Sequence, residues 1–261
     1  MRHLDLPEGP NRERVGDHSL RGSESRVLAT VGAFRAVPKE ELLEGCIASE
    51  RELDRLRQEG LIATTPFLAG KRRTTIVTLS DRGLELLESH RHVPEDGDRQ
   101  QFYAGVSRPK ELGHDIRLYS AYLDVRPRLT AEGARIKRVV LEQELKTNYQ
   151  RFLQEPNRRR SKASGEGRDA KAISDWATSH GLPVIEDSVR FPDIRIEYER
   201  PDGTLAREDL EIVTEHYRGS HASRTQSAGF RCYRSSNRLS GGRGSNKGGR
   251  SRDSRLAEEM L

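Results

Sequence analysis

Hydrophobic and charged positions alternate most regularly between residues 191 and 219. The apolar members of this alternation are Ile194, Ile196, Tyr198, Leu210 and Ile212. A period of two is typical of strands with one buried face, and Pro201-Asp202-Gly203 supplies turn residues between the two runs. The pattern predicts a β-hairpin. Since side chains two positions apart share a face, Asp193 and Glu211 are expected together on its polar side.

Upstream, residues 23–91 show helical spacing, then strand-like runs, then helical spacing again. The predicted elements are helices over 26–34, 38–43 and 49–59, strands over 61–67 and 74–79, and a helix over 81–87. Pro38 suits a first helical turn, and Gly60 suits the end of the third helix. The order helix, helix, helix, hairpin, helix predicts one small domain.

Residues 112–233 are predicted to form a second domain, joined to the first by a polar linker over 92–111. Its expected elements before the hairpin are a helix over 114–125, a buried strand over 135–141, a helix over 142–153, a helix over 173–179 and the run 182–185. After the hairpin, a helix is expected through Ala222 and Ala228 toward Phe230 and Tyr233.

Three further segments are polar. Residues 1–22 are interpreted as a flexible leader and residues 234–261 as a Ser-, Gly- and Arg-rich tail, which either strengthens sequence-independent DNA binding or only keeps the chain soluble. Residues 156–172 form a basic loop that is either a phosphate-binding arm or an insertion without a role. A hydrophobic content of 33% agrees with a chain that is solvated in part.

Composition narrows the functional classes. No run of 18 apolar residues or signal-peptide core is present, so neither a membrane span nor secretion is expected. Cys46 and Cys232 are far apart and suit neither a disulfide framework nor a zinc site, which favours a cytoplasmic location. A net charge of +5 is compatible with a nucleic-acid partner.

The segment Glu52–Ile62, followed by Val77–Leu84, resembles the winged helix-turn-helix family. In that family the third helix enters the major groove of double-stranded DNA and the hairpin touches the backbone. Carried over to this chain, the resemblance implies the DNA-binding residues Ser49, Arg51, Arg55, Gln58, Lys71, Arg72 and Arg73. The alternative is a protein-binding winged helix whose basic residues are merely solvated.

The second domain resembles the restriction-endonuclease-like PD-(D/E)xK fold, which gives an α+β chain of two domains. In that family acidic residues hold Mg²⁺ for DNA cleavage. Glu142 or Glu144 matches the helical acid, Pro192-Asp193 the first strand and Glu211 the second. The resemblance implies Glu144, Asp193 and Glu211 as catalytic residues, with Asp193 and Glu211 as metal ligands.

This chain departs from the nuclease pattern at Val213, which stands where the family has lysine. An isopropyl group supplies neither charge nor a hydrogen bond. Lys146, on the preceding helix, is one substitute, and Glu215 and His216 lie nearby in sequence. The missing cation favours a degenerate nuclease-like domain.

The order of the two domains resembles the replication-relaxation family of mobile genetic elements. Residues 211–215 keep the Thr-Glu of that family's second strand and lose its central Asp. The resemblance implies DNA binding in plasmid or integrated-element maintenance, with the nuclease-like domain as a binding or dimerisation scaffold and a homodimer as one possible state. The alternatives are an active Mg²⁺-dependent DNA endonuclease and a winged-helix transcription regulator.

Overall fold

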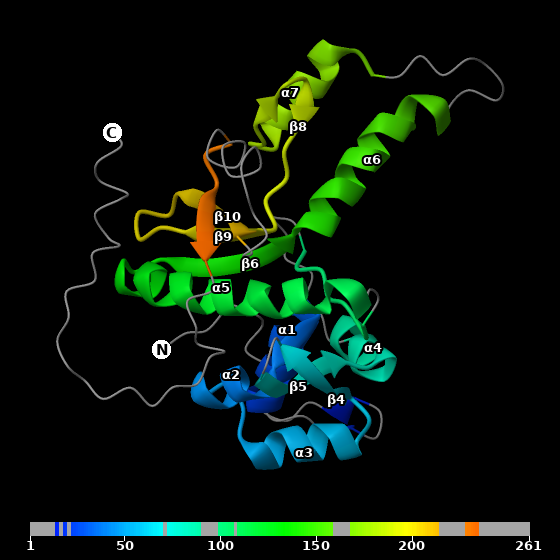
Figure 1. Cartoon of the computed structure of the whole chain (residues 1–261), viewed down its shortest axis with the longest axis vertical. Helices are drawn as coiled ribbons and strands as arrows, with labels where there is room; N and C mark the ends of the chain where they lie inside the picture. Colours follow the sequence, from blue (N-terminus) through cyan, green and yellow to red (C-terminus); the bar gives the residue numbers. More distant parts are fainter. Residues whose placement is uncertain are drawn as a thin grey trace.

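The computed structural model describes residues 14–15, 18–19, 22–69, 72–89, 99–106, 109–158, 168–213 and 228–234. Over these residues the chain has a mixed α+β fold of helices and several sheets (Figure 1). Among the described helices, none combines the length and the apolar character needed to cross a membrane. Besides the elements below, the chain forms two short hairpins, β1–β2 (Arg14–Val15, His18–Ser19) and β7–β8 (Val184–Ile185, Ser188–Val189), and a 3₁₀ turn η1 (Pro109–Glu111).

The N-terminal group of elements contains four helices and one sheet. In chain order they are α1 (Gly22–Phe34), β3 (Ala36–Pro38), α2 (Lys39–Glu44), α3 (Glu50–Gln58), β4 (Ile62–Ala69), β5 (Arg72–Leu79) and α4 (Asp81–Ser89). The sheet is antiparallel in the order β3-β5-β4. The predicted helices and hairpin are confirmed. The short strand β3 was not predicted, because three residues carry too little pattern to show a period.

Local signals define α3 at both ends. The Ser49 side chain accepts a hydrogen bond from the Glu52 amide, and the Glu52 carboxylate accepts one from the Ser49 amide at 2.8 Å. This capping box satisfies amides that a helix start leaves unpaired. Leu53 and Leu56 face the core, and Gly60 follows the helix with a φ of 69°. The helix is therefore fixed in place with its remaining face turned to solvent.

The C-terminal group builds a four-stranded sheet flanked by helices. Its elements are α5 (Leu112–Ala131), β6 (Arg135–Leu141), α6 (Glu142–Arg158), α7 (Ala170–Ser179), β9 (Ile194–Glu199), β10 (Leu205–Val213) and β11 (Arg231–Arg234). The strand order is β11-β10-β9-β6, with β11 parallel to β10 and the other neighbours antiparallel. The predicted hairpin is confirmed, and Gly203 turns it with a φ of 83°.

The predicted helix reaching Tyr233 is wrong at its C-terminal end, because Arg231–Arg234 forms strand β11. Pairing of Arg231 with Leu210 satisfies the backbone of β10, and Tyr233 is buried in the core. The stabilisation from this strand pairing and from burial of Tyr233 outweighs the local preference for a helix. Ala222 lies outside the described residues.

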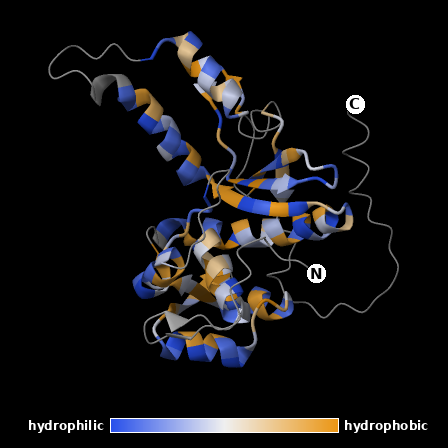
Figure 2. Cartoon of the chain, turned by 180° about the vertical axis from the view of Figure 1, so that it is seen from behind, coloured by the Kyte–Doolittle hydropathy of each residue, from blue (hydrophilic) through white to orange (hydrophobic). Residues whose placement is uncertain are grey.

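Helix α5 lies between the two groups of elements (Figure 1). The ring of Tyr119 lies 5.0 Å from that of Phe34 in α1, and Tyr122 is also 5.0 Å from Phe34. The same hydrophobic cluster continues through Leu129 to Ile194 on the sheet. Hydrophobic and hydrophilic positions alternate along the sheet strands in Figure 2, so one face of the sheet meets α5.

The free edge of β6 is capped by the side chain of Gln100. Its Oε1 accepts a hydrogen bond from the Val139 amide at 2.8 Å, and its Nε2 donates to the Val139 carbonyl at 2.9 Å. The carboxamide thus makes the two bonds that a neighbouring strand would make at this position.

Candidate functional sites

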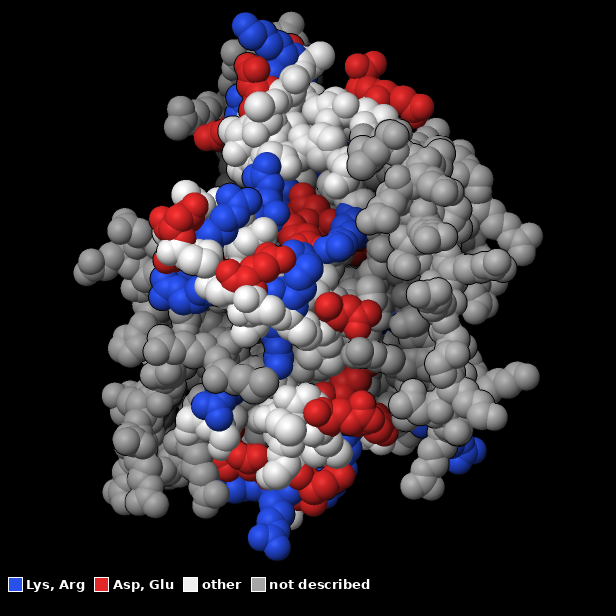
Figure 3. Space-filling model, turned by 90° about the vertical axis from the view of Figure 1, so that its left-hand side faces the viewer, with Lys and Arg blue, Asp and Glu red and all other residues white. Residues whose placement is uncertain are grey.

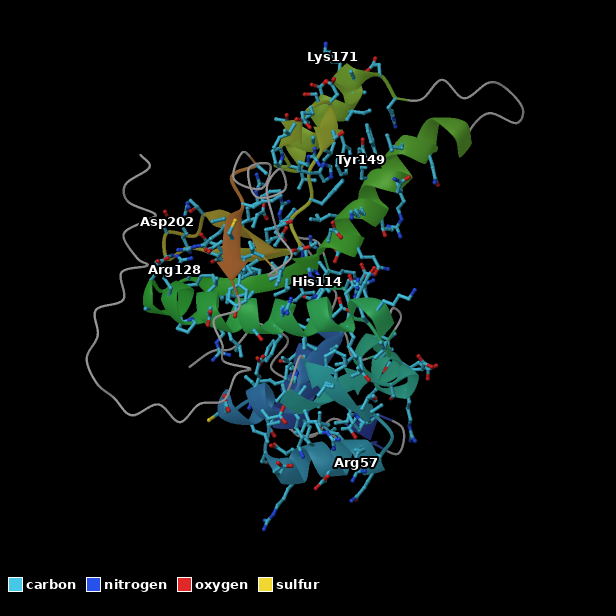
Figure 4. The ribbon with its side chains drawn as sticks, viewed as in Figure 1. Arg57, His114, Arg128, Tyr149, Lys171 and Asp202 are labelled. Atoms are coloured by element: carbon cyan, nitrogen blue, oxygen red, sulfur yellow. The ribbon has the colours of Figure 1, made fainter. Side chains whose placement is uncertain are left out.

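The exposed face of α3 carries side chains of both signs. Arg51, Asp54, Arg57 and Gln58 are all exposed, and Figure 4 shows Arg57 on the helix at the end of the molecule opposite Lys171. The Nη2 atom of Arg57 lies 3.4 Å from Asp54, while no described residue pairs with Arg51. The face therefore offers guanidinium and amide donors beside a carboxylate acceptor.

Arg55 does not stand on that face, contrary to the expectation from sequence. Its guanidinium lies 3.0 Å from Glu24 of α1 and 2.8 Å from Glu59. The hydrogen bond to Glu59 raises the pKa of Arg55 above its ordinary value, burial opposes this, and the charge of Glu24 adds to it. Glu24 is only 1% exposed, so this buried carboxylate needs the cation. Arg55 therefore anchors α3 to α1.

The β4–β5 hairpin extends beside α3. Arg73 is exposed, while Lys71 and the side chain of Arg72 lie outside the described part of the chain. Phe67 packs against the hydrophobic cluster that contains Leu112, and Leu68 remains 59% exposed near the tip. Ser49, the remaining predicted DNA contact, sits at the start of α3 with its hydroxyl engaged in the capping box.

Asp193 lies where three elements meet. The last ladder pair of the hairpin joins Ile194 to Leu210, and Asp193 directly precedes this pair as Glu211 directly follows it. The Oδ2 atom of Asp193 accepts a hydrogen bond from the Ile212 amide at 2.7 Å. Its Oδ1 atom lies 3.4 Å from Nε2 of His114 in the first turn of α5, which Figure 4 labels. Both carboxylate oxygens thus have partners within the protein.

The contact with Asp193 changes the acidity of His114. Burial alone would lower the pKa of His114, but the hydrogen bond and the charge of Asp193, with the charges of Asp115 and Glu142, raise it above its ordinary value. His114 was expected only to begin a helix. Its partner lies 79 positions away, so nothing local in the sequence could have revealed the contact.

Glu144 also faces a cation inside the protein. Its Oε1 lies 3.4 Å from Nη1 of Arg138, whose Nε binds Glu197 at 2.8 Å. Lys146, considered as a substitute for the missing lysine, lies 2.5 Å from Glu142 one helical turn away. The structure gathers the predicted acids near one end of the sheet, and arginine or histidine partners accompany Glu144 and Asp193.

These residues do not fit an assembled magnesium site. Over the described ranges, no three His, Cys, Asp or Glu side chains converge closely enough to hold a metal ion. Magnesium requires carboxylate oxygens open to the ion, whereas those of Asp193 face Ile212 and His114. The chemistry that this arrangement supports is ion pairing and proton exchange at His114.

A further acid–base pair holds the sheet to α7. Arg195 on β9 binds both carboxylate oxygens of Asp209 on β10, at 2.7 and 2.8 Å, and donates to the carbonyls of His180 and Gly181. Its side chain is only 4% exposed. Five guanidinium protons in a fixed fork suit such a site, which serves as a structural anchor.

Comparison with known proteins found no match to a family model, to a curated protein or to a solved structure. Functional interpretation therefore depends on the side chains described above.

Proposed function

We propose that the chain binds double-stranded DNA through α3 and the β4–β5 hairpin, acting together as a winged helix-turn-helix. The observation that carries the proposal is the exposed face of α3, where Arg51 and Gln58 extend from a helix fixed by its cap and by Arg55. A rigid helix with uncommitted donors on its outer face suits the major groove, where guanidinium and amide groups pair with base edges.

The hairpin supplies the second contact in this proposal. Arg73 is exposed on β5, which pairs with β4 in this hairpin, and Lys71 and Arg72 add charge in sequence at the same turn. Cations there would neutralise backbone phosphates and release counterions, which makes affinity depend on salt. The C-terminal sheet serves as a scaffold, since the α5 core joins it to the DNA-binding elements.

We further propose that the chain acts in the maintenance of a plasmid or other mobile element, as in the replication-relaxation family. Support comes from the order of the two groups of elements and from Thr214-Glu215 after the second hairpin strand. A degenerate nuclease-like sheet agrees with Val213 in the lysine position and with the engaged oxygens of Asp193.

Binding of the full chain to labelled duplex DNA across a salt series tests the proposal. Arg51→Ala is expected to weaken binding about tenfold, because it removes a donor worth roughly 1–3 kcal/mol at a base edge. Arg200→Ala removes an equal charge from the exposed turn between β9 and β10 on the C-terminal sheet and should leave affinity unchanged. No duplex binding at low salt, or equal losses in the two variants, would overturn the proposal.

A second candidate function is a winged-helix transcription regulator, which the mixed charge on the exposed face of α3 favours. The negative charge of Asp54 beside Arg57 weakens sequence-independent attraction to the DNA phosphates. It favours recognition of bases, because a carboxylate can accept a hydrogen bond from the amino group of cytosine. Competition by duplexes of unrelated sequence in the same assay distinguishes a transcription regulator from a sequence-independent DNA-binding protein. A regulator discriminates strongly among them, whereas a sequence-independent binder does not.

A further inference from the structure

A shallow groove of about 530 Å³ runs along the outer edge of β10. Strand β11 pairs with β10 only from Leu210 onward, so no described strand covers this edge over Leu205–Asp209. The residues around the groove that matter here are Gly181, Arg207, Glu208, Asp209, Gly229 and Arg231. It lies on the C-terminal sheet, away from α3.

The two carboxylates at this groove are already paired. Glu208 binds Arg128 through one oxygen and Arg231 through the other, the latter at 2.8 Å. Asp209 is held by Arg195 through both of its oxygens. Figure 3, which shows the left-hand side of the view in Figure 1, has acidic and basic side chains interleaved over this side of the molecule. Neither carboxylate has an oxygen left without a cation beside it.

Arg207 differs from its neighbours. Its Nη1 atom donates a long hydrogen bond to the His180 carbonyl at 3.4 Å, and no carboxylate of the described residues pairs with it. Two arginines, Arg207 and Arg231, line the groove together with two carboxylates, Glu208 and Asp209. Arg231 is paired with Glu208, so Arg207 is the arginine of this lining for which no described residue supplies a carboxylate.

Gly181 leaves the space that the Arg207 guanidinium occupies. A Cβ at Gly181 would overlap that guanidinium, and the φ of 55° at this residue also favours glycine. Gly229, also in the lining, has a φ of 72°, and a Cβ there would meet no atom of the described residues within 4 Å. An exposed cation thus lies at the wall of a polar groove.

We propose that this groove binds an oxyanion of the phosphate class, with Arg207 as its principal cation and Arg231 as a second contact. A planar guanidinium presents two parallel donors to a phosphate, and its charge-assisted hydrogen bonds are among the strongest in proteins. The anion is either a backbone phosphate of nucleic acid or a free phosphate. The site is independent of α3, so it stands whether or not the helix binds DNA.

The first arm of the test is a titration of the full chain with inorganic phosphate, in which binding is measured by calorimetry. Arg207→Gln is expected to weaken saturable binding about tenfold or abolish it, since a charged donor is lost. Arg200→Gln, which removes a charge from the exposed hairpin turn outside the groove, is the matched control and should bind as the parent does. Gly181→Ala keeps every charge but displaces the guanidinium, so it should behave like Arg207→Gln while retaining its circular dichroism spectrum.

Duplex DNA titrated across salt provides the second arm. If the source is nucleic acid, Arg207→Gln lowers duplex affinity and reduces the salt slope by about one, while Arg200→Gln does not. If the source is free phosphate, duplex affinity is unchanged and inorganic phosphate binding alone is lost. The proposal is overturned if Arg207→Gln and Arg200→Gln behave alike in both arms.

Discussion

Arginine serves opposite purposes at α3 and at the centre of the C-terminal sheet. Arg195 is 4% exposed and donates hydrogen bonds to Asp209 and to two backbone carbonyls. Arg51 is exposed, and no described residue pairs with it. The two residues are equivalent in charge and composition. Their difference teaches that the partners a side chain already has, more than its chemical type, decide whether it is available to a ligand.

The largest expected effect is at Arg195. Arg195→Met would leave the largely buried Asp209, whose side chain is 13% exposed, without its cation. Breaking a fully buried pair costs about 3–5 kcal/mol of unfolding free energy, and the loss here is expected toward the lower end of that range. Urea unfolding at neutral pH measures the loss. In the matched double variant Arg195→Met with Asp209→Leu, most of the stability should return, because the orphaned charge is gone. A loss well under 1 kcal/mol in the single variant would show that the pair is not an anchor.

Ser49 is predicted to act on stability more than on DNA. Ser49→Ala removes the cap of α3 and is expected to cost about 1 kcal/mol, while Ser49→Thr retains the hydroxyl and should cost much less. Chemical unfolding and duplex binding are measured on the same preparations. If Ser49→Ala lost DNA affinity without losing stability, the residue would be a DNA contact rather than a cap.

The smallest effect is the pH dependence that His114 confers. Its pKa is raised in the folded protein by Asp193, Asp115 and Glu142, against the effect of burial. Its stabilising contribution is therefore fully present below the unfolded pKa of about 6.5 and is lost as the pH rises through the folded pKa. The difference in unfolding free energy between the parent and His114→Gln should shrink as the pH rises from about 5.5 to about 8.5, which is roughly the range over which histidine titrates.

Asp193→Asn provides the control for that pH profile. It removes the charge that faces His114, so the pH dependence of the difference should flatten in this background. A difference that stays constant, or grows, as the pH rises would contradict the assigned ion pair.

Elements with strong local signals could be predicted from the sequence. The hairpin around Gly203 follows from its alternation and turn residues, and α3 follows from its serine cap and leucine spacing. Strands β3 and β11 could not be predicted, since each is three or four residues long and exists through pairing with a distant partner. Short strands are defined by their neighbours, and a single sequence does not show them.

For the candidate sites too, local placement could be predicted from the sequence, whereas contacts with distant residues could not. Alternation predicted Asp193 and Glu211 on one side of the hairpin, and the confirmed register reaches the adjacent pair, Ile194 with Leu210, because it follows from a tight turn. It could not show that His114 and the Ile212 amide would engage the Asp193 oxygens. Likewise, helical spacing placed Arg55 near the exposed face, and only the fold brings Glu24 against it.

The amide of Gln100 has a consequence for how copies of this protein behave together. An open strand edge is a template onto which another chain can add its own backbone, which is a common start of aggregation. At Val139 both backbone groups on the β6 edge are already bonded to one side chain. A strand from a second molecule arriving there would first have to displace that carboxamide. One glutamine outside the sheet thus discourages association at an edge that would otherwise invite it.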